Sequence, residues 1–359
     1  ISIQYRLGAL GFLYSGDGAG QFGGNFGLLD QQLALKWAQA NVGAFGGAAD
    51  QVTLFGQSAG GASVASHLAM PTSAGLFARA VVMSGSDAIP FRTTTSAPKF
   101  TRVVSKRAGC GAEGYESCMR NLSWVHVVDA QMLAVKDLFV ELGHFLSLFQ
   151  PYAPTAGTEL LPTQPLLAMQ RGEAHDVPII FGSVQQEGLV FLYNAYNNSR
   201  MTWYDMDGML GLVYGVQHVR EIKRAYPPTE VEKFVDDMRN DTAPIATDSL
   251  FHCFARHAAL CLDTQRKSGT RKSSTYVYHY DHVVSFGRQF WLPLDPICVD
   301  AVCHGSELPV LFQPVLTPIG ANFTADELAL SASMQTYWSN LAHGGAPGAA
   351  GRGAGGGDG

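Results

Sequence analysis

The chain has 359 residues and is 47% hydrophobic, which is enough to bury the core of one large α/β domain or two medium ones. A net charge of −6 with no long basic run argues against a nucleic-acid-binding protein and against a polybasic membrane patch. No uninterrupted apolar stretch is as long as a transmembrane helix. The chain opens in a strand-like pattern without a methionine or a charged leader, so we expect a fragment that begins inside a strand.

The first part of the chain alternates between the two kinds of secondary structure. Residues 1–6, 52–55 and 80–83 are short apolar runs typical of strands, and residues 28–42 carry apolar side chains at helical spacing. A helix of small residues is expected from Ala59 onward. Strand and helix in alternation predict a mostly parallel sheet with helices on both faces.

The middle of the chain predicts a helical insertion and two further strands. Residues 88–148 are mostly amphipathic and helical, and we expect them to cover the sheet edge. Prolines punctuate residues 152–165, which predicts a hairpin-like stretch. Residues 177–184 and 275–282 predict strands, and residues 203–262 are helical in pattern.

The C-terminal part ends in a segment that cannot pack. A last helix is expected over residues 325–341. Residues 344–359 are rich in glycine and carry no apolar side chain larger than alanine and proline, which predicts a disordered tail. The sequence therefore predicts one α/β domain, residues 1–343, incomplete at its N-terminus.

Residues 56–60 form a G-x-S-x-G pattern between a predicted strand and a predicted helix. In this pattern Ser58 caps a sharp turn, which presents its weakly nucleophilic hydroxyl to a base. A Cβ at Gly56 or Gly60 is expected to collide as the turn tightens, and the N–H of Ala59 points toward a developing oxyanion. The pattern also occurs by chance in Gly/Ser-rich loops, but the strand before it and the helix after it favour catalysis.

A nucleophilic serine needs a histidine as base and an acid that orients the histidine. His304 is the best candidate base, because it opens a loop with Gly305 behind it. In α/β-hydrolases the acid lies between serine and histidine in the chain, and Glu187 fits because it follows a buried strand. Asp176 is the rival, but it precedes that strand and would lie at the opposite edge.

Six cysteines divide into local pairs and leftovers. Two pairs bracket short loops and could each close as a disulfide: Cys110 with Cys118, and Cys298 with Cys303. Cys253 and Cys261 are expected on one helix, about 12 Å apart, which is too far to bridge. They are predicted to be buried thiols.

Four N-x-S/T sequons begin at Asn121, Asn197, Asn240 and Asn322, and predict glycosylation sites. Together with disulfide-sized loops they favour a secreted protein or one of the secretory pathway.

Several motifs together resemble the type-B carboxylesterase and cholinesterase family, from residue 1 to about residue 346. They are Asn25-Phe-Gly-Leu-Leu-Asp30, Trp37, Phe45-Gly-Gly47, Val52-Thr-Leu-Phe-Gly-Gln-Ser-Ala-Gly60, Gly75-Leu-Phe77, Ser84-Gly85, Glu187-Gly188 and His304-Gly-Ser-Glu307-Leu308.

The resemblance implies an α/β-hydrolase fold and hydrolysis of a small-molecule ester through an acyl-enzyme. It implies that Ser58, Glu187 and His304 form the catalytic triad and that Cys110 pairs with Cys118. We expect no metal and no cofactor. The sequence does not indicate the oligomeric state or the acyl chain length.

The chain also departs from the family pattern. Gln57 stands where the animal enzymes usually have glutamate, and the usual Gly-Gly-Asp-Pro is broken at residues 46–50. The family's Gly-Gly oxyanion loop would precede residue 1, so two of its three donors are missing here. Losing one such donor typically costs about 10²- to 10³-fold in rate, so we expect this fragment to be weak or inactive and its parent protein to be active. Nothing supports acetylcholine as the substrate.

The alternative function is a non-catalytic adhesion or binding domain, because a fold does not guarantee an activity. The same family contains members that kept the fold and lost the serine or its partners. Intact Ser58, Glu187 and His304 favour the enzyme.

Overall fold

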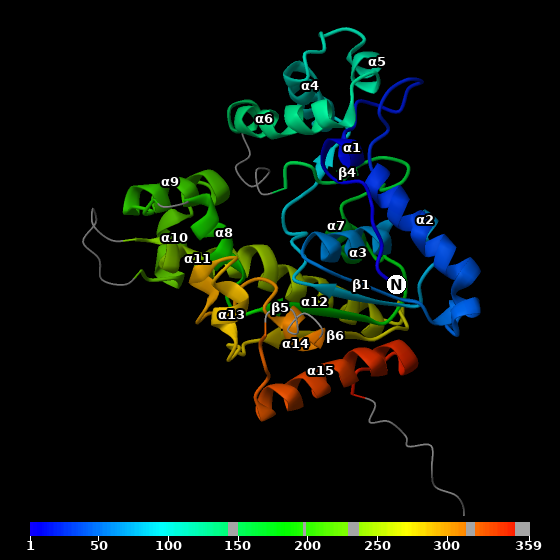
Figure 1. Ribbon diagram of the computed structural model, residues 1–359, viewed down its shortest axis with the longest axis vertical. Coiled ribbons are helices and arrows are strands. Elements are labelled where there is room, and N and C mark those ends of the chain that lie inside the picture. The colour runs from blue at the N-terminus through cyan, green and yellow to red at the C-terminus, as the bar shows by residue number, and fades with distance from the viewer. Residues whose placement is uncertain (143–149, 197–198, 229–236, 314–319, 349–359) are drawn as a thin grey trace, which may run out of the picture.

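The computed structural model describes residues 1–142, 150–196, 199–228, 237–313 and 320–348. At its centre is a four-stranded, wholly parallel sheet in the order β1-β2-β5-β6 (Figure 1). These strands are β1 (Thr53–Gln57), β2 (Arg79–Met83), β5 (Ile179–Val184) and β6 (Thr275–Tyr280). The predicted parallel sheet is confirmed.

The inner strands are apolar because both of their faces are covered. All six residues of β5 are buried, and in β2 every residue after Arg79 is buried. Parallel strands with helices on both faces have this continuous apolar pattern. In the outer strand β6, half-buried and exposed residues alternate along part of the strand, which is typical of a strand nearer solvent.

Helices surround the sheet. Before and around the insertion they are α1 (Gly8–Phe12), α2 (Phe26–Asn41), α3 (Ala59–Ala69), α4 (Ala97–Arg107), α5 (Tyr115–Arg120), α6 (Trp124–Leu142) and α7 (Pro165–Arg171). The later ones are α8 (Glu187–Ala195), α9 (Trp203–Tyr214), α10 (Val219–Ala225), α11 (Arg239–Thr247), α12 (Cys253–Lys267), α13 (Gly287–Trp291), α14 (Glu307–Leu311) and α15 (Ala325–Gly344). The helices expected within residues 28–42, 88–148, 203–262 and 325–341 and from Ala59 onward are present, whereas α1, α7, α8, α13 and α14 were not predicted.

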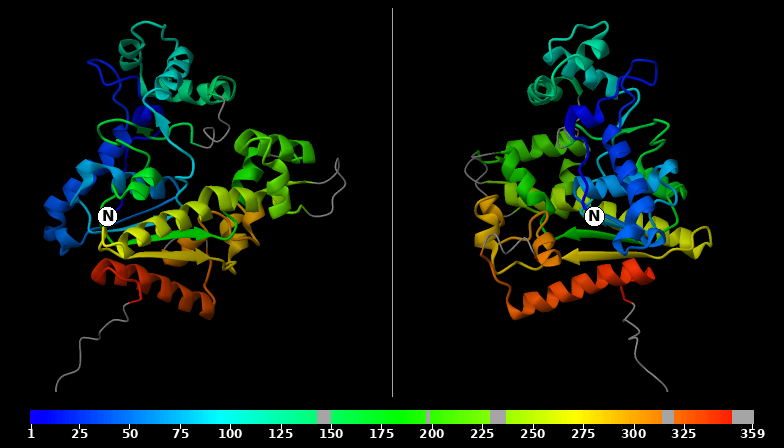
Figure 2. Two further views of the ribbon diagram at one scale, coloured as in Figure 1. Left: turned by 180° about the vertical axis from the view of Figure 1, so that it is seen from behind. Right: turned by 45° about the vertical axis from the view of Figure 1, so that its right-hand side comes forward.

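Two apolar clusters cover the two faces of the sheet. On one face α3, α7 and α12 pack on the strands, with Leu68 and Leu262 fully buried. On the other face α14 and α15 pack on them, through Val310, Met334 and Leu341. Figure 2 shows the long α15 lying across its face of the sheet. The sheet is therefore covered on both faces.

The predicted insertion is helical: α4, α5 and α6 form a layer at the top of Figure 1, away from the central sheet. The expected hairpin over residues 152–165 is wrong. Strand β4 (Thr155–Ala156) pairs in parallel with β3 (Arg92–Thr93). Prolines are typical of local turns, but the partner of β4 is a segment about sixty residues earlier in the chain.

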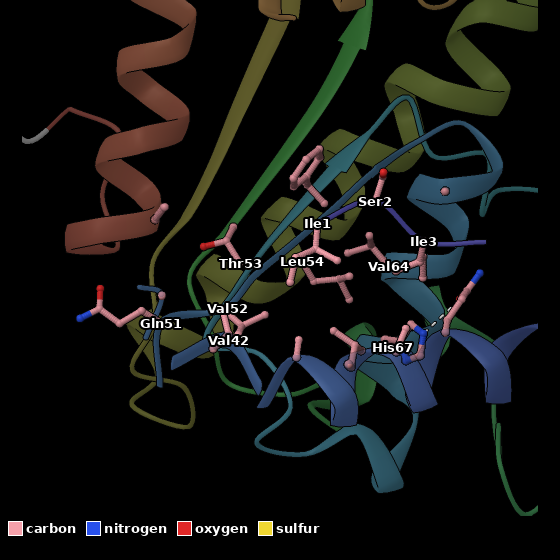
Figure 3. Close-up of a pocket in the computed structure, with 18 of the residues that line it drawn as sticks. Ile1, Ser2, Ile3, Val42, Gln51, Val52, Thr53, Leu54, Val64 and His67 are labelled. Carbon is pink, nitrogen blue, oxygen red and sulfur yellow. Dashed lines mark hydrogen bonds between the residues drawn. The ribbon is translucent and has the colours of Figure 1, made fainter. Parts of the chain in front are cut away.

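The predicted N-terminal strand does not form within the described residues. Residues 1–7 have no regular structure, because no described segment runs in a ladder with them. A cavity of about 710 Å³ lies between residues 1–5 and the outer edge of β1, and Figure 3 shows Ile1, Leu54 and Val64 around it.

Helix α15 begins in a capping box, in which Thr324 and Glu327 satisfy each other's backbone N–H. It ends at Gly344, with Gly345 in the left-handed conformation behind it. Residues 349–359 of the glycine-rich tail lie outside the described residues. None of the described helices is both long and apolar enough to cross a bilayer.

Candidate active site

Ser58 lies at the sharp turn between β1 and α3. Its backbone has φ 58° and ψ −119°, which is strained for a residue with a side chain. Two hydrogen bonds hold it there: its N–H donates to the carbonyl of Met83, and its carbonyl accepts from Ala62. The turn is therefore clamped to the end of β2 and to the first turn of α3, as expected for a nucleophile elbow.

The two glycines of the turn differ. A Cβ on Gly56 would overlap the backbone of Gly60, which confirms the expectation for Gly56. The expectation for Gly60 is wrong, because a Cβ there would meet nothing within 4 Å. Gly60 lines the cavity beside β1, so there is open space where a collision was predicted.

Glu187 and His304 lie in contact. Nδ1 of His304 donates to Oε2 of Glu187 at 2.5 Å, and Oε1 of Glu187 accepts the N–H of Val184 at 2.8 Å. The carboxylate is fully buried and the imidazole is 10% exposed. An acid held in this way fixes the imidazole in the tautomer that leaves Nε2 as the base.

The two loops that carry this pair are joined directly. Gln186 donates its N–H to the carbonyl of Val302, and its side-chain oxygen accepts the N–H of Val302. A disulfide between Cys298 and Cys303 ends at the residue before His304. These links hold the histidine loop against the end of β5, and sequence reasoning missed Gln186 although it directly precedes Glu187.

The free side of His304 faces Gln57. Nε2 of the imidazole and Nε2 of the Gln57 amide are 3.1 Å apart, so in this tautomer the amide donates to the base nitrogen. The hydroxyl of Ser58 makes no hydrogen bond to the described residues. Catalytic hydrogen bonds are often long without substrate and tighten in the complex. The departure at position 57 therefore lies at the centre of the site.

Two aromatic rings flank the imidazole of His304. The centroids of Phe191 and Phe251 lie 5.0 and 5.2 Å from it, and the two rings stack on each other at 5.9 Å. Sequence reasoning missed both, because they lie on separate helical segments and neither belongs to a motif. They exclude water from one side of the base, which strengthens its bond to Glu187.

A second buried carboxyl lies near Glu187. Burial, and then the negative charge of Glu187, raise the pKa of Glu307 to about 8, so Glu307 is neutral at pH 7. The buried hydroxyl of Tyr278 lies beside it. The two buried carboxyls are therefore close enough for the charge on Glu187 to affect the pKa of Glu307.

The remaining predicted residues fall in different places. Ala59 is the first residue of α3, so its N–H is among the donors left unpaired by a helix N-terminus. Asp176, the rival acid, accepts from the N–H groups of Lys272 and Ser273 at the opposite edge of the sheet. It does not contact His304.

The cysteines pair as the local loops suggested. Cys110 bonds to Cys118, and Cys298 bonds to Cys303. The prediction that the other two are buried is wrong: Cys253 is exposed and Cys261 is half-buried. Their helical spacing was correct, but both lie away from the side of α12 that packs on the sheet, where Phe254, Ala258 and Leu262 are buried.

Three of the four sequon asparagines, Asn121, Asn240 and Asn322, are exposed. Asn197 lies outside the described residues. Glycosylation at these positions stays a prediction.

The cavity beside β1 is a separate feature. It is lined mostly by apolar side chains of β1, α2, α3 and the N-terminal segment, and none of Ser58, Glu187 and His304 contributes to it (Figure 3). The described residues contain no group of three or more His, Cys, Asp or Glu side chains that could hold a metal ion.

A serine on a strand-to-helix elbow, with an acid and a histidine following later strands of a parallel sheet, is the arrangement of an α/β-hydrolase. The solved structure of PNB esterase has the same fold: the TM-score is 0.71 at 26% identity, covering 96% of this chain and 65% of that one.

The chain belongs to the carboxylesterase family, whose model matches residues 1–354. Its relatives include the crystal protein of Dictyostelium discoideum, 32% identical over 95% of this chain and 58% of that protein. Acetylcholinesterase of Bungarus fasciatus is 30% identical over 97% of this chain and 56% of that protein. Neuroligin-2 of Mus musculus is 29% identical over 97% of this chain and 40% of that protein. The chain thus spans less than two thirds of the length of these relatives, and the family resemblance is confirmed.

Proposed function

We propose that this protein is a serine carboxylic-ester hydrolase that works through an acyl-enzyme. The observation that carries the proposal is the buried bond from His304 to Glu187, at the sheet edge where Ser58 occupies its strained turn. Family membership supports an ester as the substrate class. No step in this reaction needs a metal or a cofactor.

The proposed reaction begins when the Gln57 amide releases Nε2 of His304. Nε2 then takes the proton of Ser58 as the hydroxyl attacks the ester carbonyl, and Glu187 stabilises the imidazolium. The N–H of Ala59 donates to the oxyanion, together with the glycine-loop donors that the family resemblance implies upstream. The imidazolium protonates the leaving alcohol, and water repeats the cycle on the acyl-enzyme.

A non-catalytic binding domain is the second candidate, and one observation favours it. The amide of Gln57, rather than the hydroxyl of Ser58, lies at the base nitrogen of His304. If that contact is permanent, the serine has no base.

A fluorophosphonate probe separates the two functions, because it labels only an activated serine. In the full-length protein we expect one label, at Ser58, and hydrolysis of a nitrophenyl ester. Ser58→Ala should lose both. Ser63→Ala is the matched control, since Ser63 lies one turn further along α3 and bonds to the carbonyl of Ala59 and to Gln31. A full-length protein that takes no label would establish the binding domain instead.

Two disulfides and three exposed sequons support a secretory route. We therefore propose a secreted esterase, and a shift in electrophoretic mobility after glycosidase treatment of the protein from its native source tests that location.

A further inference from the structure

A second histidine–carboxylate pair lies directly behind the turn that holds Glu187. Asp248 and His252 are the two ends of a single π-helical turn between α11 and α12. Such turns are rare and often mark functional sites. Here the wider turn brings Nδ1 of His252 to 2.9 Å from Oδ1 of Asp248.

The other nitrogen of His252 contacts the backbone of β5. Its Nε2 lies 2.9 Å from the carbonyl oxygen of Val184. A carbonyl oxygen only accepts, so this nitrogen of His252 donates to Val184. The second oxygen of Asp248 accepts the hydroxyl of Tyr226 at 2.5 Å, so the imidazole is held between Asp248 and the end of β5.

Val184 connects this pair to the proposed acid. Its carbonyl accepts from His252, and its N–H donates to Oε1 of Glu187. The other oxygen of Glu187 accepts from His304. Two sets of hydrogen bonds, one from Asp248 through His252 and one from His304 through Glu187, therefore meet at the backbone of the same residue, Val184.

Other titratable groups also face His252. Tyr226 donates to Asp248, and that bond raises the pKa of Tyr226 above its usual value. The ring of His279 on β6 meets the ring of His252 edge-on at 5.0 Å, and Cys253 is its neighbour in the chain. His252 is therefore enclosed by Asp248, by the end of β5 and by the ring of His279.

We propose that His252 is a positioning residue for Glu187. This inference rests on the proposed esterase function. Without the imidazole, the carbonyl of Val184 loses its donor and Asp248 loses its partner. The end of β5 is then less firmly held, and Glu187 orients His304 less well.

The first test compares His252→Gln with the wild type and with His257→Gln. His257 is the matched control. It lies on the next helical turn, and its ring contacts Gln170 and Cys261, which are not part of the proposed site. We expect His252→Gln to lower kcat about tenfold with KM unchanged, since small misplacements of a catalytic group cost up to about 10²-fold.

Tyr226→Phe provides a milder variant in case His252→Gln does not fold. It removes one hydroxyl that helps to orient Asp248, and we expect kcat to fall by only about threefold, because Asp248 and His252 both remain. Unchanged kcat in every folded variant would overturn the proposal.

Nitrogen-15 NMR of labelled histidine separates this proposal from the esterase function. We expect the Nδ1 proton of His304 to shift in His252→Gln but not in His257→Gln. If the wild type hydrolyses no ester but this difference appears, the esterase function fails and the positioning role stands. An unshifted His304 signal in His252→Gln would refute the role whatever the activity.

Discussion

At the scale of single residues, the site differs from its family pattern in Gln57. A neutral amide can donate to the imidazole without favouring the charged form, whereas a glutamate there would stabilise the imidazolium. In the proposed reaction, the amide therefore adds no negative charge beside His304. It also places a hydrogen-bond donor at the nitrogen that would receive the proton of Ser58.

Gln57→Glu should move the activity profile to higher pH. A carboxylate within about 4 to 6 Å favours a neighbouring positive charge by about 1 to 3 pH units. Because His304 must be neutral to act as the base, the pH at which kcat/KM reaches half its maximum should be about 1 unit higher in Gln57→Glu than in the wild type. Activity should recover above that pH. Gln170→Glu is the matched control, since Gln170 contacts His257 in the same way outside the site. Identical profiles for both variants would contradict a direct role of position 57.

At the scale of elements, the turn between β1 and α3 depends on one glycine rather than two. Gly56→Ala places a methyl group against the backbone of Gly60, which cannot move without opening the turn. We expect the free energy of unfolding to fall by about 1 to 3 kcal/mol, and the fluorophosphonate probe to label Ser58 more slowly. Gly60→Ala meets open space in a helix, so it should be neutral or stabilising by up to about 1 kcal/mol. Urea unfolding of the two variants measures this difference. Equal losses of unfolding free energy in Gly56→Ala and Gly60→Ala would refute the claim that the turn depends on Gly56 alone.

Helix α15 is anchored by the buried carboxylate of Glu327. Burial alone would raise its pKa, but the N–H groups of Ser285 and Thr324 and the hydroxyl of Ser285 outweigh burial and lower the pKa to about 2. A depressed folded-state pKa stabilises the protein above the unfolded value and loses that effect as the pH falls through the folded one.

Glu327→Gln should therefore destabilise the protein at pH 7 by on the order of 2 kcal/mol, with the difference from wild type shrinking below about pH 4. Asp326→Asn, one residue earlier and exposed, serves as the control. Denaturant midpoints measured between acid and neutral pH test this, and a difference that does not depend on pH would contradict it.

At the scale of the whole molecule, two short disulfides restrain the unfolded chain, but only one lies near the site. Replacing either pair by serine should lower the free energy of unfolding by about 2 kcal/mol, the loss expected for small loops. Only the Cys298 and Cys303 replacement should also reduce kcat, because Cys303 precedes His304. Thermal unfolding and ester turnover of both double variants test this, and equal turnover would show that the loop holds His304 without its disulfide.

The sequence alone determined the features that depend on neighbouring residues. The sequence predicted the four strands of the central sheet, the longer helices around it and the Ser58 turn. The spacing of apolar residues and the positions of glycines are local signals. Positions after strands and in loops pointed to Glu187 and His304, and the family motifs agreed, but no local signal places the two side chains in contact. The 152–165 stretch failed because its strand partner is far away in the chain.

Only the tertiary structure decided which distant side chains meet. The contact of Gln57 with His304, the aromatic rings beside it and the pair of His252 with Asp248 behind Val184 depend on how separate elements pack. The same holds for the exposure of Cys253 and the open space at Gly60. Periodicity predicts that a residue lies on a helix or strand, but burial and hydrogen bonding depend on the partner that covers each face.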